Sequence, residues 1–226
     1  MEVHLQELTA QDRETLKAIS VFGEDGTTVR PGRLVAGLDV SPATVTARLK
    51  RLHDLGLADH VPYAGVTLTE QGIKVTVTII RRHRIVERFL VDMLGYGWEE
   101  AEELAPHFEH ALPRDVVQRL YETLGKPETC PHGFPIPSPD SDSLPMLRSL
   151  VELDPGDVAE IAVPSNTDPE VVEYLAELGV HPGVRIKVKD KLPFDGPVTI
   201  TVNGVDQTVG NKLARMLSVM TPDRSF

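Results

Sequence analysis

The sequence is poor in cysteine, with Cys130 alone among 226 residues. One cysteine cannot form an internal disulfide, which excludes the small disulfide-stapled secreted class. Cys130 is then either an inert small hydrophobe or a thiolate with a specific role. Long apolar runs are also missing: no stretch reaches eighteen residues, and the first residues show no basic region followed by an apolar one. We therefore expect a soluble, cytoplasmic protein with no membrane partner.

The sequence has few basic residues: 23 Lys and Arg residues are outnumbered by 34 Asp and Glu residues, which gives a net charge of -11. This excludes nucleic-acid binding through bulk charge, since phosphates are neutralised by local Lys and Arg. Any DNA contact must therefore be a confined basic surface. The acidity fits either carboxylates gathered around cations or the ordinary surface charge of a soluble protein.

Common catalytic signatures are missing as well. The sequence contains no HExxH zinc motif, no G-x-S-x-G nucleophile turn and no Walker-type glycine loop. We therefore expect a protein that is not an enzyme, and a metalloenzyme is the least favoured alternative.

The first part of the chain has the order helix, helix, turn, helix, hairpin. Apolar spacing predicts helices over 11–22, 29–38 and 42–55, followed by short strands over 57–61 and 66–69. Ser41 and Pro42 are typical of an N-cap and a first helical residue. This order predicts a winged helix-turn-helix DNA-binding domain over 1–72. A three-helix packing unit, or a winged helix used for protein contacts, is the alternative.

The helix over 42–55 is the candidate DNA reader, because the major groove accepts a helix whose N-terminal residues face base edges. Its Val45, Leu49, Leu52 and Leu55 point inward, which leaves polar residues on the other faces. We predict DNA contacts from Ser41, Thr44, Thr46 and Arg48, with Lys50 and Arg51 nearer the phosphates.

The remaining chain divides into a helical part and a β-rich part. Amphipathic helices are predicted over 71–95, 98–112 and 114–124, and they suit either a homodimer interface or packing within one chain. The segment 126–145 is rich in proline, serine and aspartate, so it is a linker or an ordered extended crossing. Strands over 157–163, 184–188 and 198–202, with a short helix over 169–178, predict a small β-barrel. The fold class is thus mostly α with β, with domains at 1–72, 73–146 and 147–226.

Histidines and carboxylates recur at helical spacing in the middle part. His83 and Glu87 are four residues apart, and Glu102, Glu109 and His110 return to one face of the next helix. Mixed nitrogen and oxygen ligands suit manganese, ferrous iron, cobalt or zinc. Each pair alone is common without a metal, and the set as a whole indicates one; a polar helix interface in a metal-independent regulator is the alternative.

Two further candidates follow along the chain. Cys130-Pro131-His132 offers a soft ligand and an imidazole two residues apart, although the same composition also makes a tight turn. Asp168, before Pro169, is either a helix N-cap or a ligand.

At these residues the sequence resembles the diphtheria toxin repressor family of iron- and manganese-dependent regulators, over nearly the whole chain. The resemblance is carried in order by SPATVTARLKRLHDLGL, LTEQG, RRHRIVERFLVDMLG, FEHAL, CPHGFPIP and DPEVVEYLAELGVHPG. It implies a repressor that binds divalent metal as a corepressor, then binds operator DNA of metal-uptake genes as a dimer, and it implies an SH3-like (FeoA-like) C-terminal domain.

The resemblance also implies two metal sites. The first maps onto Glu14, His83, Glu109 and His110, and the second onto Glu87, Cys130, His132 and Asp168, while Glu102 matches a ligand position of iron-type members. This chain departs from the family at Pro106, where a Cys or Glu ligand is usual, and at Lys17, where manganese members often carry Glu. We expect a backbone carbonyl of Glu102 or Pro106, a water or Asp12 to replace the missing side chain. The carboxylate-rich set favours Mn(II), with Fe(II) as the alternative and Zn(II), Co(II) or Cd(II) binding in vitro.

Overall fold

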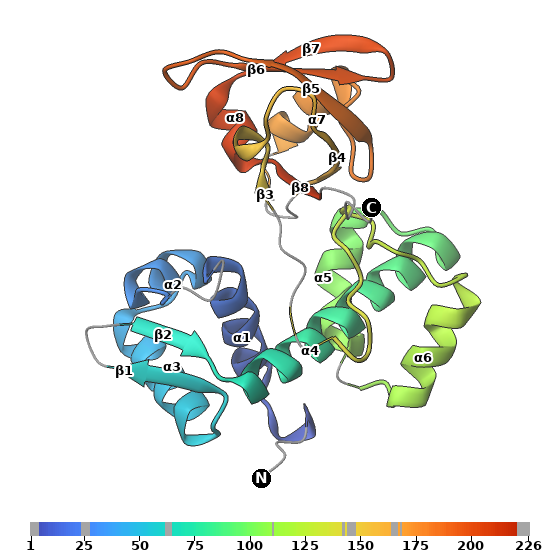
Figure 1. The fold of residues 1–226 in the computed structure, drawn as a ribbon. Helices are drawn as coiled ribbons and strands as arrows, with labels where there is room; N and C mark the ends of the chain where they lie inside the picture. Colours follow the sequence, from blue (N-terminus) through green and yellow to red (C-terminus); the bar gives the residue numbers. More distant parts are fainter. Residues whose placement is uncertain are drawn as a thin grey trace.

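The structure is a computed structural model that describes residues 5–23, 28–61, 65–109, 111–141, 143, 148–163, 167 and 169–220. Its N-terminal part packs α1 (Ala10–Phe22), α2 (Pro31–Leu38) and α3 (Pro42–Asp54) against the hairpin of β1 (Ala58–Val61) and β2 (Gly65–Leu68), after a short turn of 3-10 helix η1 (Leu5–Glu7) (Figure 1). The predicted winged helix-turn-helix is therefore confirmed. One core holds it together, with Leu16, Leu34, Leu49 and Leu52 fully buried.

Local signals explain where these helices begin. Thr9 and Asp12 form a capping box at the start of α1, and the Ser41 hydroxyl accepts a hydrogen bond from Thr44 N at the start of α3. The prediction that a helix starts at Val29 was wrong. Val29 instead pairs with Val66 through two backbone hydrogen bonds, which extends the wing and delays α2 to Pro31.

A single long helix connects the DNA-binding part to the middle of the chain. Helix α4 (Glu70–Arg88) continues as one π-helical segment, η3 (Phe89–Met93), and Figure 1 shows it running from the winged helix to α5 (Trp98–Glu109) and α6 (Arg114–Thr123). A Cβ on Gly72 would lie 1.9 Å from the carbonyl oxygen of Leu57, so the first turn of α4 lies directly on the base of the wing. Movement of the winged helix is thereby tied to α4.

The proline-rich segment after α6 is an ordered extended crossing in the part that the structure describes, up to Ser141. Three arginines on one face of α4 hold it through backbone carbonyls: Arg81 Nη1 donates to Pro137 at 2.6 Å, Arg84 to Pro135, and Arg88 Nε to Thr129 at 2.7 Å. Their spacing of three and four residues places them on the same side of the helix.

The C-terminal part is built on a six-stranded antiparallel sheet in the order β3-β8-β4-β5-β6-β7. Its strands are β3 (Arg148–Ser149), β4 (Val158–Ala162), β5 (Arg185–Lys191), β6 (Val198–Val202), β7 (Val205–Val209) and β8 (Ser218–Met220). The 3-10 turn η4 (Leu150–Glu152) and helices α7 (Pro169–Glu177) and α8 (Asn211–Met216) complete it. The sheet and these helices enclose one buried apolar core. Within the described residues, no helix is long and apolar enough to cross a membrane.

Candidate metal centre

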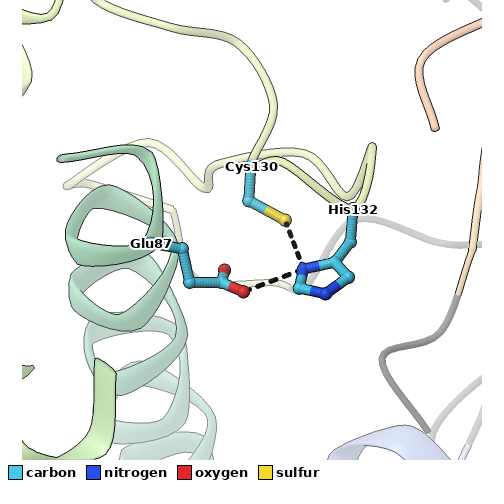
Figure 2. A group of neighbouring side chains, drawn as sticks. All are labelled: Glu87, Cys130 and His132. Atoms are coloured by element: carbon cyan, nitrogen blue, oxygen red, sulfur yellow. Dashed lines mark hydrogen bonds and ion pairs between the residues drawn. The ribbon is translucent and has the colours of Figure 1, made fainter. Parts of the chain in front are cut away.

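Glu87, Cys130 and His132 meet in the interior, where α4 faces the extended crossing (Figure 2). Each offers one ligand atom, and these atoms all lie within 4.8 Å of one another. His132 Nδ1 is 2.9 Å from Glu87 Oε1 and 4.0 Å from Cys130 Sγ. All three residues are at most 2% exposed.

Two atoms of this group have no hydrogen bond of acceptable geometry in the described part of the chain: Glu87 Oε1 and His132 Nε2. Burying a carboxylate oxygen and an imidazole nitrogen without hydrogen bonds is costly unless a ligand satisfies them. A carboxylate, a thiol and an imidazole are also a set that takes transition metals. The orphaned atoms and the donor types therefore both fit a bound cation.

A second group adjoins the first on the other side of Glu87. His83 Nδ1 donates to Glu109 Oε2 at 2.8 Å, and His83 Nε2 is 3.4 Å from Glu102 Oε2 and 3.9 Å from Glu87 Oε1. His83, Glu87 and Glu102 also bring ligand atoms within 4.8 Å of one another. Glu87 is thus common to both groups.

In the second group, a proton on His83 offsets the negative charge of the surrounding carboxylates. Burial lowers the pKa of His83, and so does the nearby ammonium of Lys17, but the hydrogen bonds to Glu102 and Glu109 raise it to about 9. Burial raises the pKa of Glu102, yet His83 brings it down to about 2. An imidazolium therefore lies among the carboxylates at neutral pH and occupies the electrostatic role of a cation.

The thiol of the first group behaves differently. Burial first, and then the charge of Glu87, raise the pKa of Cys130 to about 12. Cys130 is therefore a neutral thiol until a cation draws its proton away.

Several predicted ligands lie elsewhere. The side chain of Glu14 is paired with Arg48 of α3 and is 53% exposed. Asp12, one of the four alternatives for the missing ligand, is used in the α1 capping box and in an ion pair with Arg51. Pro106 lies inside α5, which continues past it to Glu109. His110 and Asp168 fall outside the described residues.

The predicted DNA-contacting residues all lie on or beside α3. Ser41, Thr46, Lys50 and Arg51 are exposed, whereas Thr44 and Arg48 are half-buried. Ser41 and Thr44 engage each other at the helix start, at 2.9 Å between their hydroxyls. Arg48 and Arg51 both form ion pairs with carboxylates of α1.

Contacts between the metal-site loop and the C-terminal part were not predicted from the sequence. Val163 N donates to the carbonyl of His132 at 3.0 Å, and a Cβ on Gly133 would lie 2.5 Å from Ile161 O. The ring of Trp98 contacts the His132 ring edge-on, with centroids 4.9 Å apart. The only sequence signal for this close approach is the glycine that directly follows His132.

The three parts of the chain match three family models in the same order. Residues 7–66 match the N-terminal DNA binding domain of the iron dependent repressors, residues 69–138 match their metal binding and dimerisation domain, and residues 148–221 match the FeoA domain. The chain is also 31% identical to the iron-dependent repressor IdeR of Mycobacterium tuberculosis over 230 residues, which cover 95% of this chain and 99% of that protein. The chain belongs to the diphtheria toxin repressor family.

Further members of the diphtheria toxin repressor family agree with this assignment. The diphtheria toxin repressor of Corynebacterium glutamicum is 26% identical over 215 residues, which cover 90% of this chain and 93% of that protein. Among solved structures, a manganese-dependent transcriptional repressor in complex with manganese superposes with a TM-score of 0.74 at 30% identity, covering 93% of this chain and all of that one. ScaR with bound Cd2+ gives 0.75 at 28% identity, covering 93% and 99%. The predicted family and fold class are confirmed, and the chain is a metal-dependent repressor with DNA-binding and dimerisation domains.

Proposed function

We propose that this repressor holds divalent cations at two neighbouring sites that share Glu87. One site consists of Glu87, Cys130 and His132 with Asp168, and the other of the same Glu87, His83, Glu102 and Glu109 with Glu14 and His110. The observation that carries the proposal is the meeting of Glu87, Cys130 and His132 in the interior, where Glu87 Oε1 and His132 Nε2 are buried without a hydrogen bond. Burying such atoms is costly, and a cation held by these three residues would offset part of that cost.

Mn(II) is the corepressor that we propose, with Fe(II) as the alternative. Three carboxylates surround His83, and hard oxygen ligands suit Mn(II). Zn(II), Co(II) and Cd(II) should also bind in vitro, because Cys130 and His132 provide soft and borderline ligands. Supporting this reading, the structural neighbours include repressors solved with manganese, zinc and cadmium.

The bound cation supplies positive charge, and the side chains of this chain convert it into a change of DNA affinity. Glu14 belongs to α1 of the winged helix, whereas His83 and Glu109 belong to α4 and α5. When Glu14 turns from Arg48 toward the second site, it would fix the angle of the winged helix and free Arg48 to contact DNA. Coupling of roughly 1–3 kcal/mol is the expected scale for such linkage.

The DNA target that we propose is an operator bound by a homodimer, so that two α3 helices read successive major grooves. Ser41, Thr44, Thr46 and Arg48 would contact the DNA at the base edges, with Lys50 and Arg51 nearer the phosphates. The domain limits that we propose are 1–72, 73–146 and 147–226. A cytoplasmic, non-enzymatic role follows from the repressor assignment.

Fluorescence anisotropy tests the function directly, using duplex DNA taken upstream of the organism's own manganese or iron importer genes. Binding is measured at fixed salt in chelator, Mn(II), Fe(II) and Zn(II), because phosphate contacts make affinity depend on salt. Tight binding only with metal is the expected result. Equal binding in chelator would overturn the corepressor role and leave a metal-independent winged-helix regulator.

A further inference from the structure

A cleft of about 320 Å³ lies between α4, α6 and the end of the extended crossing, and none of its lining residues belongs to either metal group. Its polar wall is formed by Thr78, Arg81, Arg82, Arg114, Asp115, Gln118 and Ser138. A volume of this size is in the range that holds a small organic ligand.

The wall of this cleft is net positive, whereas the whole protein is net negative. Three guanidinium groups face one carboxylate in its wall, although the whole chain has a net charge of -11. Arg81, Arg82 and Arg114 take part in none of the ion pairs found among the described residues. Arginines gathered in this way are normally paired with carboxylates or with bound anions.

Two of these arginines are fixed before any ligand arrives. Arg81 is buried, donates to Pro137 O, and stacks on the Tyr121 ring with 4.2 Å between its guanidinium carbon and the ring centroid. Its Nη2 atom has no hydrogen-bond partner in the described part of the chain. Arg82 Nη2 donates to Leu112 O at 2.5 Å. Guanidinium groups held in this manner lose little entropy when an anion binds.

Arg114 adds a third guanidinium group to the cleft wall beside Arg81 and Arg82. Arg114, the first residue of α6, is exposed and free to turn toward the cleft. The helix start itself has no side-chain cap, so its backbone N–H groups add to the attraction for an anion.

We propose that this cleft is a binding site for a small phosphate-bearing anion. The planar donors of arginine match phosphate oxygens in pairs, and the apolar side chains of Val77 and Val117 leave room for a small organic group beside the phosphate. Arg82 lines this cleft and also lines, with Glu109, a separate small cavity. An anion bound here would therefore reduce the positive potential at Glu109.

Isothermal titration of metal-free protein with inorganic phosphate and with pyrophosphate, in Tris chloride without chelator, tests the site independently of any cation. Saturable binding of pyrophosphate is expected, with weaker binding of phosphate. Arg114→Gln should weaken pyrophosphate binding about fivefold, since one charge-assisted contact is lost. Arg119→Gln removes another exposed arginine of α6 that does not line the cleft, and it should leave binding unchanged.

A variant that is expected to tighten pyrophosphate binding distinguishes a specific effect on the site from a general loss of folding. Asp115→Asn removes the one carboxylate in the cleft wall and should tighten pyrophosphate binding. Absence of saturable binding, or equal weakening in Arg114→Gln and Arg119→Gln, would overturn the proposal. So would a loss of operator affinity in Arg114→Gln in phosphate-free buffer, because the cleft would then belong to the DNA-binding surface.

Discussion

Arg48 Nη1 of the recognition helix and Glu14 Oε2 of α1 lie 2.8 Å apart. Arg48 is a predicted DNA contact and Glu14 a predicted metal ligand. When neither DNA nor metal is bound, the two side chains are engaged with each other. Each side chain can satisfy one strong partner at a time. With the roles proposed for these two residues, metal binding and DNA binding would act on the same ion pair from opposite ends.

Glu14→Gln should weaken the metal response while raising DNA binding in chelator. The amide no longer neutralises Arg48, and it is a poor substitute for a carboxylate ligand. The ratio of DNA affinities with Mn(II) and with chelator should fall about tenfold, within the usual range of allosteric coupling. Anisotropy with the operator fragment measures both affinities. Glu70→Gln, which removes an exposed ion pair with Lys74, is the matched control and should change neither.

Cation binding should become tighter as pH rises toward 9. His83 is protonated below its pKa of about 9, and a cation must displace that proton before the imidazole can coordinate. Calorimetry in buffers of different ionisation enthalpy should show release of about two protons at pH 7.5 when both sites fill, one from His83 and one from the thiol of Cys130, and of about one proton in Cys130→Ser. Binding without proton release would contradict the assignment of His83 as a ligand.

The raised pKa of His83 also makes the stability of the metal-free protein depend on pH. The pKa of His83 is raised from 6.5 in the unfolded chain to about 9 in the folded one. Its contribution to the free energy of unfolding is therefore fully present below pH 6.5 and is lost as pH rises through 9. Denaturation of metal-free protein between pH 6 and 9.5 should show this decline, and saturating Mn(II) should reduce it.

Cys130→Ser should discriminate between soft and hard cations. A hydroxyl replaces a thiolate that favours Cd(II) and Zn(II), whereas Mn(II) depends more on the surrounding oxygens. Affinity for Cd(II) should fall by more than about tenfold and affinity for Mn(II) by less. Competition with a chromophoric chelator measures both. An equal loss for both cations would show that Cys130 serves packing alone.

Helix periodicity and caps allowed much of the fold to be predicted from the sequence. Pro42 begins α3 as expected, and β6 has the predicted bounds of 198–202. Strand β7 was missed because Val205-Asp206-Gln207-Thr208-Val209 is mostly exposed and carries little apolar alternation. The two-residue β3 and three-residue β8 are too short for any pattern.

The sequence predicted which helix residues of the candidate site lie close together, and it indicated less about the rest. Spacing along α4 and α5 brought His83, Glu87, Glu102 and Glu109 into one prediction because a helix fixes which residues share a face. The pairing of Glu14 with Arg48 depends on how α1 packs on α3, which no local pattern encodes. Contact between Gly133 and Ile161 likewise arises only once the C-terminal part has folded.

Dimerisation should depend on the apolar surface around the end of η3. Four of the ten exposed large hydrophobic residues of the described chain fall between residues 93 and 108, and Met93 and Leu94 are 56% and 54% exposed. Leu94→Glu should yield a monomer in sedimentation velocity and lose operator affinity, because one half-site alone is bound. Phe194→Glu changes a fully exposed residue of the C-terminal part and should leave the dimer intact. A dimer in both variants would place the interface elsewhere.

The metal-site loop should transmit the C-terminal domain's position to the cation through Gly133. This glycine has a φ of 84°, and a Cβ there would meet Ile161 O at 2.5 Å and Gly183 N at 2.9 Å. Gly133→Ala must therefore push the Cys130–His132 turn away from the C-terminal part, which breaks the hydrogen bond from Val163 to His132. The Mn(II) concentration needed for half-maximal operator binding should rise about tenfold or more.

Gly125→Ala provides the control that isolates this contact. Gly125 has a similar φ of 77°, but a Cβ there would meet nothing within 4 Å, so the substitution carries the backbone strain without the collision. Both variants should lose about 1 kcal/mol of stability from that strain. Only Gly133→Ala should also shift the metal midpoint. If the two variants shift it equally, the loop responds to backbone strain, and docking on the C-terminal part plays no role in cation binding.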